Sequence, residues 1–122
     1  MLFFAFWVLS ATVTLGAFLA FMYLRAAHVL PSAVAITHGS LGAFGIAALA
    51  YALSREPIRG VAYGVSSFGV VAAALGGLAL LLGFTIALLK WRTNRRVGLL
   101  IGVHATFAVA AYTLLLAYVS LG

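Results

Sequence analysis

Two histidines at matching positions of two apolar segments are the residues of this chain whose type and spacing best suit chemistry. His38 is the seventh residue after Pro31, where the second apolar segment begins, and His104 is the seventh residue after Val97, where the fourth begins. A histidine inside a membrane is costly and marks a functional site, with the second histidine as its expected partner. Two neutral imidazoles that face each other across a helical bundle are able to ligate a metal, and haem iron is the leading candidate.

The composition predicts the elements that must position these histidines. The chain has 122 residues, of which 66% are hydrophobic and 7% charged, whereas a soluble domain carries about 25% charged residues. Its four uncharged runs each exceed the roughly 20 residues that cross a bilayer. We therefore expect an all-α membrane protein, a four-transmembrane-helix up-and-down bundle in the lipid bilayer. The single membrane domain covers residues 1–122, with helices over about 2–24, 31–53, 66–89 and 97–120.

The basic residues predict the orientation of the bundle. Five of the seven lie in or beside the first and third loops, namely Arg25, Lys90, Arg92, Arg95 and Arg96, and the other two lie in the second loop. Lys and Arg favour the cytoplasmic side, so we expect both termini outside a bacterial inner membrane. The net charge of +6 comes from residues at helix ends and indicates no nucleic-acid partner.

A repeat relates the two halves of the chain. Leu15, Gly16, Ala20 and Arg25 recur 67 residues later, and His38, Leu49 and Ser54 recur 66 residues later as His104, Leu115 and Ser120. The pattern predicts two repeated helical hairpins around an axis along the membrane normal. In such a bundle the second and fourth helices are diagonal, about 11–14 Å apart. A metal with one imidazole on each side fits this gap better than a direct contact between the two rings.

Small residues share the helix faces that carry the histidines. Gly42 and Gly45 follow His38 by four and seven residues, and Ala108 and Ala111 follow His104 by the same steps. Gly16 and Gly83 fall near the same layer on the first and third helices. These residues either leave room for a flat macrocycle or allow the close packing that membrane helices need, and the sequence leaves both interpretations open.

The basic residues nearest the histidines have two interpretations as well. Haem b carries two propionates, and Arg25 and Arg92, which recur in the repeat, are the best candidates to pair with them. A positive-inside cluster needs no ligand. His28 lies in the first loop, and we expect it to be solvated and not to bind a metal.

A four-helix membrane unit with histidines on its second and fourth helices resembles the small membrane b-type cytochromes. Among these are bis-histidine haem b subunits of bacterial oxidoreductases and the haem-carrying anchors of succinate dehydrogenase. The resemblance rests on the architecture, on His38 and His104, and on their glycine and alanine neighbours. It implies that the two histidines are the axial ligands. Families that bind two haems use two histidines on each ligating helix, whereas this chain has one on each, so the resemblance implies one haem b.

Three classes of function compete on these observations. The first is an electron-transfer subunit that passes electrons to or from quinone or a partner subunit, with the exchange near Arg25, Arg92, Arg95 and Arg96. The second is a haem-free structural or assembly subunit of a larger membrane complex. The third, a transporter, is the weakest, because the one acidic residue, Glu56, falls in a loop. The chain contains no nucleophile–base–acid set, so we expect it to be a non-catalytic subunit.

Overall fold

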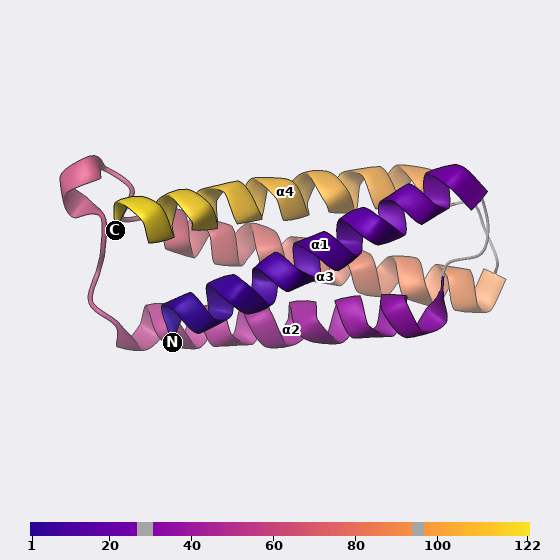
Figure 1. The fold of residues 1–122 in the computed structure, drawn as a ribbon, viewed down its shortest axis with the longest axis horizontal. Helices are drawn as coiled ribbons and strands as arrows, with labels where there is room; N and C mark the ends of the chain where they lie inside the picture. The colour runs from indigo at the N-terminus through magenta and orange to yellow at the C-terminus, as the bar shows by residue number, and fades with distance from the viewer. Residues whose placement is uncertain (27–30, 94–96) are drawn as a thin grey trace.

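The computed structural model describes residues 1–26, 31–93 and 97–122, and they form four long helices (Figure 1). The helices are α1 (Leu2–Ala26), α2 (Ser32–Arg55), α3 (Phe68–Thr93) and α4 (Gly98–Leu121), and the short 3₁₀ helix η1 (Val61–Tyr63) precedes α3. All four are long and apolar enough to cross a membrane. The predicted all-α four-helix architecture is confirmed, and each helix begins and ends within four residues of its expected bounds.

The local sequence explains where α2 begins and how hydroxyl side chains are accommodated inside the helices. Pro31 stands at the N-cap of α2, one residue before the helix, where its missing N–H costs nothing. Hydroxyl groups inside the helices donate to the backbone carbonyl four residues earlier, as Thr37 does to Ala33 and Thr106 to Gly102. These two threonines therefore satisfy their hydroxyls within their own helices and do not bind a histidine.

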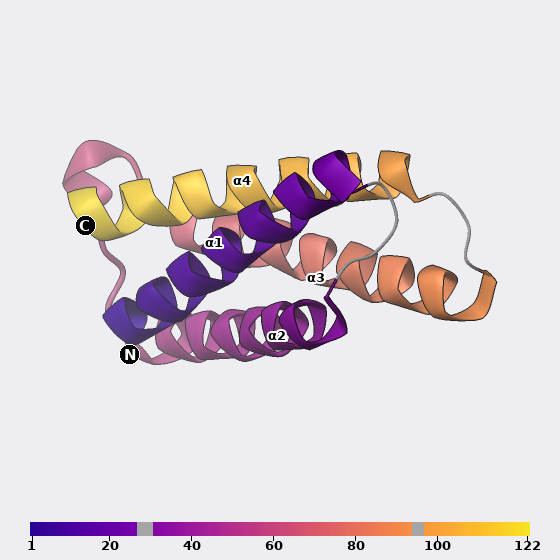
Figure 2. The same ribbon diagram turned by 45° about the vertical axis from the view of Figure 1, so that its right-hand side comes forward.

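The helices run up and down, as the views in Figures 1 and 2 agree. Both chain termini and η1 lie at one end, called here the termini end. The opposite end carries Arg25, Lys90 and Arg92 and is called the basic end. The strongest packing is within the hairpins α1–α2 and α3–α4, and the hairpins meet through α2–α3 and α1–α4. Helices α2 and α4 are therefore diagonal, and α1 crosses the bundle obliquely toward α4 at the basic end (Figure 2).

The tightly packed core lies at the termini end. Its two largest fully buried side chains are Leu49 and Leu115, each 1% exposed and related by the repeat. Around them pack Leu2, Ala5, Leu9, Ala48, Ala52, Ala72 and Tyr118. By contrast, in the described segments 13–25, 32–44, 80–92 and 98–110 no residue is buried. Among the described residues at the basic end, burial is confined to Val97, just before α4, so the bundle is more closely packed at the termini end.

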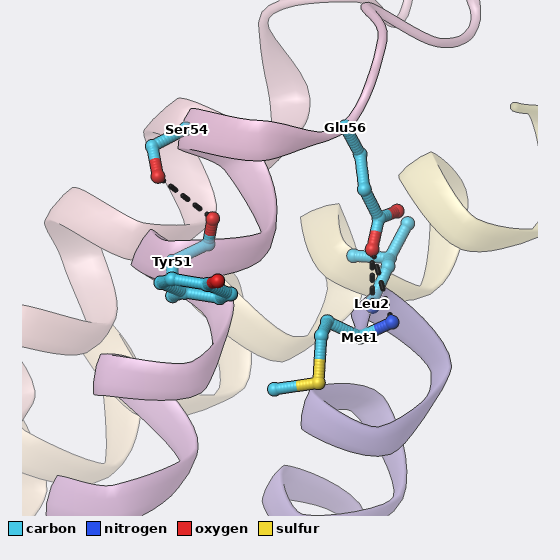
Figure 3. A network of polar contacts seen from close by, with 5 residues as sticks. All are labelled: Met1, Leu2, Tyr51, Ser54 and Glu56. Atoms are coloured by element: carbon cyan, nitrogen blue, oxygen red, sulfur yellow. Dashed lines mark hydrogen bonds and ion pairs between the residues drawn. The ribbon is translucent and has the colours of Figure 1, made fainter.

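One carboxylate joins the start of α1 to the end of α2 (Figure 3). Glu56 Oε1 accepts a hydrogen bond from the Leu2 N–H at 3.0 Å and forms an ion pair with the amino group of Met1 at 3.0 Å. The hydrogen bond from that amino group, followed by the one from Leu2, holds the pKa of Glu56 below its ordinary value. The carboxylate also faces the positive end of the α1 dipole, so it stabilises the first turn of α1.

Candidate metal centre

The imidazoles of His38 and His104 meet between the diagonal helices α2 and α4. Their ring centroids are 6.0 Å apart, and the ring planes are inclined at 77°. This edge-to-face arrangement lies within the contact range of aromatic rings. The fold therefore brings together the two histidines that the sequence singles out. Their rings are in direct edge-to-face contact, whereas the sequence favoured a wider gap with a metal between them.

Each imidazole is held by the helix that precedes its own in the hairpin. His38 Nδ1 lies 2.9 Å from the carbonyl oxygen of Thr12 on α1, and His104 Nδ1 lies 2.7 Å from the carbonyl oxygen of Ala79 on α3. A carbonyl oxygen only accepts hydrogen bonds, so each neutral ring carries its proton on Nδ1 and a lone pair on Nε2. No described residue donates a hydrogen bond to either Nε2 atom. Histidines that bind metals usually have this arrangement, with the second ring nitrogen donating to a carboxylate or backbone carbonyl.

The number of donors favours one kind of metal group. Imidazole nitrogens bind metals at about 2.0–2.1 Å, so two rings on opposite sides of one ion have their centres roughly 6 Å apart. The 6.0 Å between the two rings here is also the distance of a direct edge-to-face contact, so this distance fits both arrangements. Among the described residues, no group of three or more His, Cys, Asp or Glu side chains could hold a metal ion. A structural zinc site requires four protein ligands. The pair therefore suits a metal that brings its other ligands with it, as haem iron does.

Two glycines make room for the imidazoles themselves. A Cβ atom on Gly16 would stand 2.9 Å from His38 Cε1, and one on Gly83 would stand 3.1 Å from His104 Cε1. The sequence left open whether these two glycines make room for a macrocycle or allow close packing, and in the fold a histidine ring lies against each of them. Any contribution of Gly16 and Gly83 to cofactor binding acts through the histidines.

Of the other small residues predicted at the site, two are packed inside the bundle and two are half-buried near the histidines. A Cβ on Gly45 would stand 2.7 Å from Leu9 Cδ2, so this glycine allows α1 and α2 to approach closely. Ala111 is buried. Gly42 and Ala108, nearer the histidines, are half-buried, and a Cβ on Gly42 would meet Thr12 Cγ2 at an ordinary 3.4 Å. A ligand beside the imidazoles would therefore contact Gly42 and Ala108 before the two deeper positions.

The predicted cationic residues stand at the basic end. Arg25 and Arg92 are exposed, and the guanidinium of Arg25 lies 4.9 Å from the centre of the Phe21 ring. The ammonium of Lys90 lies 5.7 Å from the Tyr23 ring. The one acidic side chain of the chain, Glu56, contacts Met1 and Leu2 at the termini end. Neither arginine is therefore paired with an acidic side chain, and both have charge available for an anionic group.

Three residues considered in the sequence fall outside the described part of the chain. They are His28, which we expected not to bind a metal, and Arg95 and Arg96, which we expected beside the site of electron exchange.

Sequence reasoning missed the backbone carbonyls that hold the imidazoles. Thr12 and Ala79 have different side chains, and it is their main-chain oxygen atoms that contact the histidines. A search by residue type has no signal for such contacts. The repeat offers the one available clue, because both residues stand four positions before the repeated glycines Gly16 and Gly83.

Comparisons of the chain with protein families, with curated proteins and with solved structures gave no significant match.

Proposed function

We propose that this chain is a membrane electron-transfer subunit that binds one haem b with His38 and His104 as axial ligands. The observation that carries the proposal is the pair of imidazoles 6.0 Å apart, each held through Nδ1 by a backbone carbonyl so that Nε2 is available. The absence of a third ligand from the described part of the chain favours a metal inside a macrocycle over a bare ion.

A macrocycle held by both imidazoles would have its centre between the two rings and would extend toward both ends of the bundle. Toward the basic end no residue in the described helical segments is buried, and toward the termini end the neighbouring Gly42 and Ala108 are small and half-buried. A flat ligand would therefore displace little existing core next to the rings. Bound haem would supply one-electron redox chemistry. The chain's own residues would orient the two imidazoles, exclude water with apolar helix faces, and offer Arg25 and Arg92 to the propionates.

The electron donor and acceptor must reach this site from outside the chain. The four helices account for nearly all described residues, and the sequence has no cysteine for an iron–sulfur cluster. Quinone or a partner subunit of an oxidoreductase complex therefore exchanges electrons near Arg25 and Arg92. We place the protein in a bacterial inner membrane, as its resemblance to haem b subunits of bacterial oxidoreductases implies. Its termini would lie outside, because the basic end carries the excess of Lys and Arg.

The visible spectrum of the purified protein tests the proposal. We expect a reduced-minus-oxidised signal of a low-spin haem b, one haem per chain, and its loss in His38→Ala and in His104→Ala. His28→Ala is the matched control and should keep the signal. A folded chain without haem after expression with sufficient haem, or haem retained in both single variants, would contradict the proposal.

A second candidate function is a haem-free structural subunit of a membrane complex. Gly39, Gly77 and Gly102 favour it, because a Cβ atom at each would meet nothing within 4 Å. Small residues on open helix faces allow a second helix to approach closely. Sizing in mild detergent distinguishes the two functions when it is combined with the spectrum. A stable complex without haem supports the structural role, and a haem-containing complex supports electron transfer.

A further inference from the structure

The same arrangement of backbone and imidazole occurs twice in this bundle. In the first hairpin the His38 ring lies over Gly16 and its Nδ1 faces the carbonyl of Thr12, four residues before that glycine. In the second hairpin the His104 ring lies over Gly83, and its Nδ1 faces the carbonyl of Ala79, again four residues earlier. The two copies agree although Thr12 and Ala79 differ in side chain, so the arrangement depends on the main chain and on the glycine.

The glycine is what lets each ring reach the carbonyl. Residues four apart lie on the same face of a helix. An imidazole that contacts the carbonyl of Thr12 or Ala79 must therefore lie over the residue four positions later, which is Gly16 or Gly83. A Cβ atom at Gly16 would approach His38 Cε1 to 2.9 Å, and one at Gly83 would approach His104 Cε1 to 3.1 Å. The ring would have to move away from the helix, and its Nδ1 would move away from the carbonyl oxygen, which is now 2.9 or 2.7 Å distant.

We infer that Gly16 and Gly83 are positioning residues that fix the tautomer of His38 and His104, so that both rings keep a proton on Nδ1 and a lone pair on Nε2 without a metal. The assignment of the tautomer follows from the geometry alone. Its consequence, that Nε2 is ready to bind iron before haem arrives, rests on the proposed function. The helix backbone would thus prepare both ligands in advance, once in each hairpin.

The chain offers controls that isolate this effect. Gly39 on α2 is adjacent to His38, and Gly102 on α4 is two residues before His104. A Cβ on Gly102 meets nothing within 4 Å, and one on Gly39 meets nothing beyond its two chain neighbours, one of which is His38 itself. Substituting alanine at these glycines changes the helix backbone in the same way as at Gly16 and Gly83. At Gly102 the added methyl group meets neither imidazole, so Gly102→Ala is the stricter control.

The test is ¹⁵N NMR of the haem-free full chain with labelled histidine, in a His28→Ala background so that two imidazoles are observed. Protonated and unprotonated ring nitrogens have well-separated shifts. We expect Nδ1 protonated and Nε2 unprotonated in both rings. Gly16→Ala should raise the share of the Nε2-protonated form for His38 only, and Gly83→Ala should do so for His104 only. Gly39→Ala and Gly102→Ala should leave both signals unchanged.

Three results would overturn the inference: Nε2 protonated in the parent protein, no change in either signal on Gly16→Ala or Gly83→Ala, or equal changes in the control variants. If Gly16→Ala does not fold, the inference is tested with Gly83→Ala, where the added Cβ makes the less severe contact, and with the spectrum of the parent protein. Haem titration is measured separately. If the tautomers are as expected but no haem binds, the proposed function is refuted and this inference stands. If haem binds but the rings have the other tautomer, this inference is refuted and the proposed function stands.

Discussion

The hydroxyl groups of Ser10 and Tyr112 lie 2.8 Å apart and join α1 to α4. The Ser10 hydroxyl donates to the carbonyl of Phe6 at 2.8 Å, so its oxygen accepts the proton of Tyr112. The Tyr112 ring also stacks on Phe6, with centroids 5.9 Å apart. At the other junction between the hairpins, α2–α3, the close contact is instead apolar, between Ile46 and Gly76. The two halves repeat each other at the histidines and differ where they join.

We expect Tyr112→Phe to lower the free energy of unfolding in detergent by about 0.6 kcal/mol, the mean value for a hydrogen bond between membrane helices. The substitution keeps the stacked ring and removes only the hydroxyl. Tyr51→Phe is the control, because Tyr51 is 52% exposed. Equal destabilisation by the two variants would show that the Ser10–Tyr112 bond contributes nothing to joining the hairpins.

A large side chain should destabilise the protein at Gly76 but not at the adjacent Gly77. A Cβ on Gly76 would clash with Ile46 Cδ1, whereas a Cβ on Gly77 meets nothing within 4 Å. Overpacking costs about 1–3 kcal/mol, so Gly76→Leu should lower the unfolding free energy by about that amount. Gly77→Leu should leave it nearly unchanged.

Unfolding curves of the two variants give the measurement. A tolerated Gly76→Leu would contradict the α2–α3 contact. If Gly77→Leu leaves stability unchanged but reduces the size of a complex in mild detergent, the open face at Gly77 is where a partner helix binds.

Glu56 should make the stability of the chain depend on pH in the acid range. Its pKa in the folded protein lies below the ordinary value of 4.5, chiefly because of its hydrogen bond with the amino group of Met1. A lowered pKa means that the carboxylate contributes its full stabilisation above the ordinary value, and that this contribution is lost as pH falls through the lowered pKa.

The Tm of the parent protein should therefore exceed that of Glu56→Gln at neutral pH, and the two values should converge in acid. Glu56 is the one Asp or Glu side chain in the sequence, so few other groups complicate the measurement. A constant difference in Tm across this range would show that the charge of Glu56 is irrelevant to its role.

The placement of the helix ends predicts the membrane topology. The end of α1 with the start of α2, and the end of α3 with the start of α4, share the basic end, whereas Gly122 lies at the termini end. Reporter tags in the segments 27–30 and 94–96 should thus report the same compartment, the cytoplasm. A tag at Gly122 should report the opposite one. Tags in the two loops reporting different compartments would contradict the up-and-down bundle.

The sequence alone was sufficient to predict the four helices and the common depth of the two histidines. Four uncharged runs longer than a bilayer crossing have one stable form, because every backbone N–H and C=O must be satisfied within the segment. Helix bounds followed within four residues. The equal spacing of His38 from Pro31 and of His104 from Val97 placed both rings at one depth, because the rise along a helix is constant.

Only the tertiary structure decided how the rings are held and what each small residue does. The oblique path of α1 and the hairpin contacts determine that His38 reaches the carbonyl of Thr12 and fills the space over Gly16. The same contacts place Leu9 against Gly45 and leave Gly39 open. In a sequence all these glycines look alike, because a missing side chain carries no information about its neighbour. The neighbour is set by how the helices cross, and this depends on packing across the whole bundle.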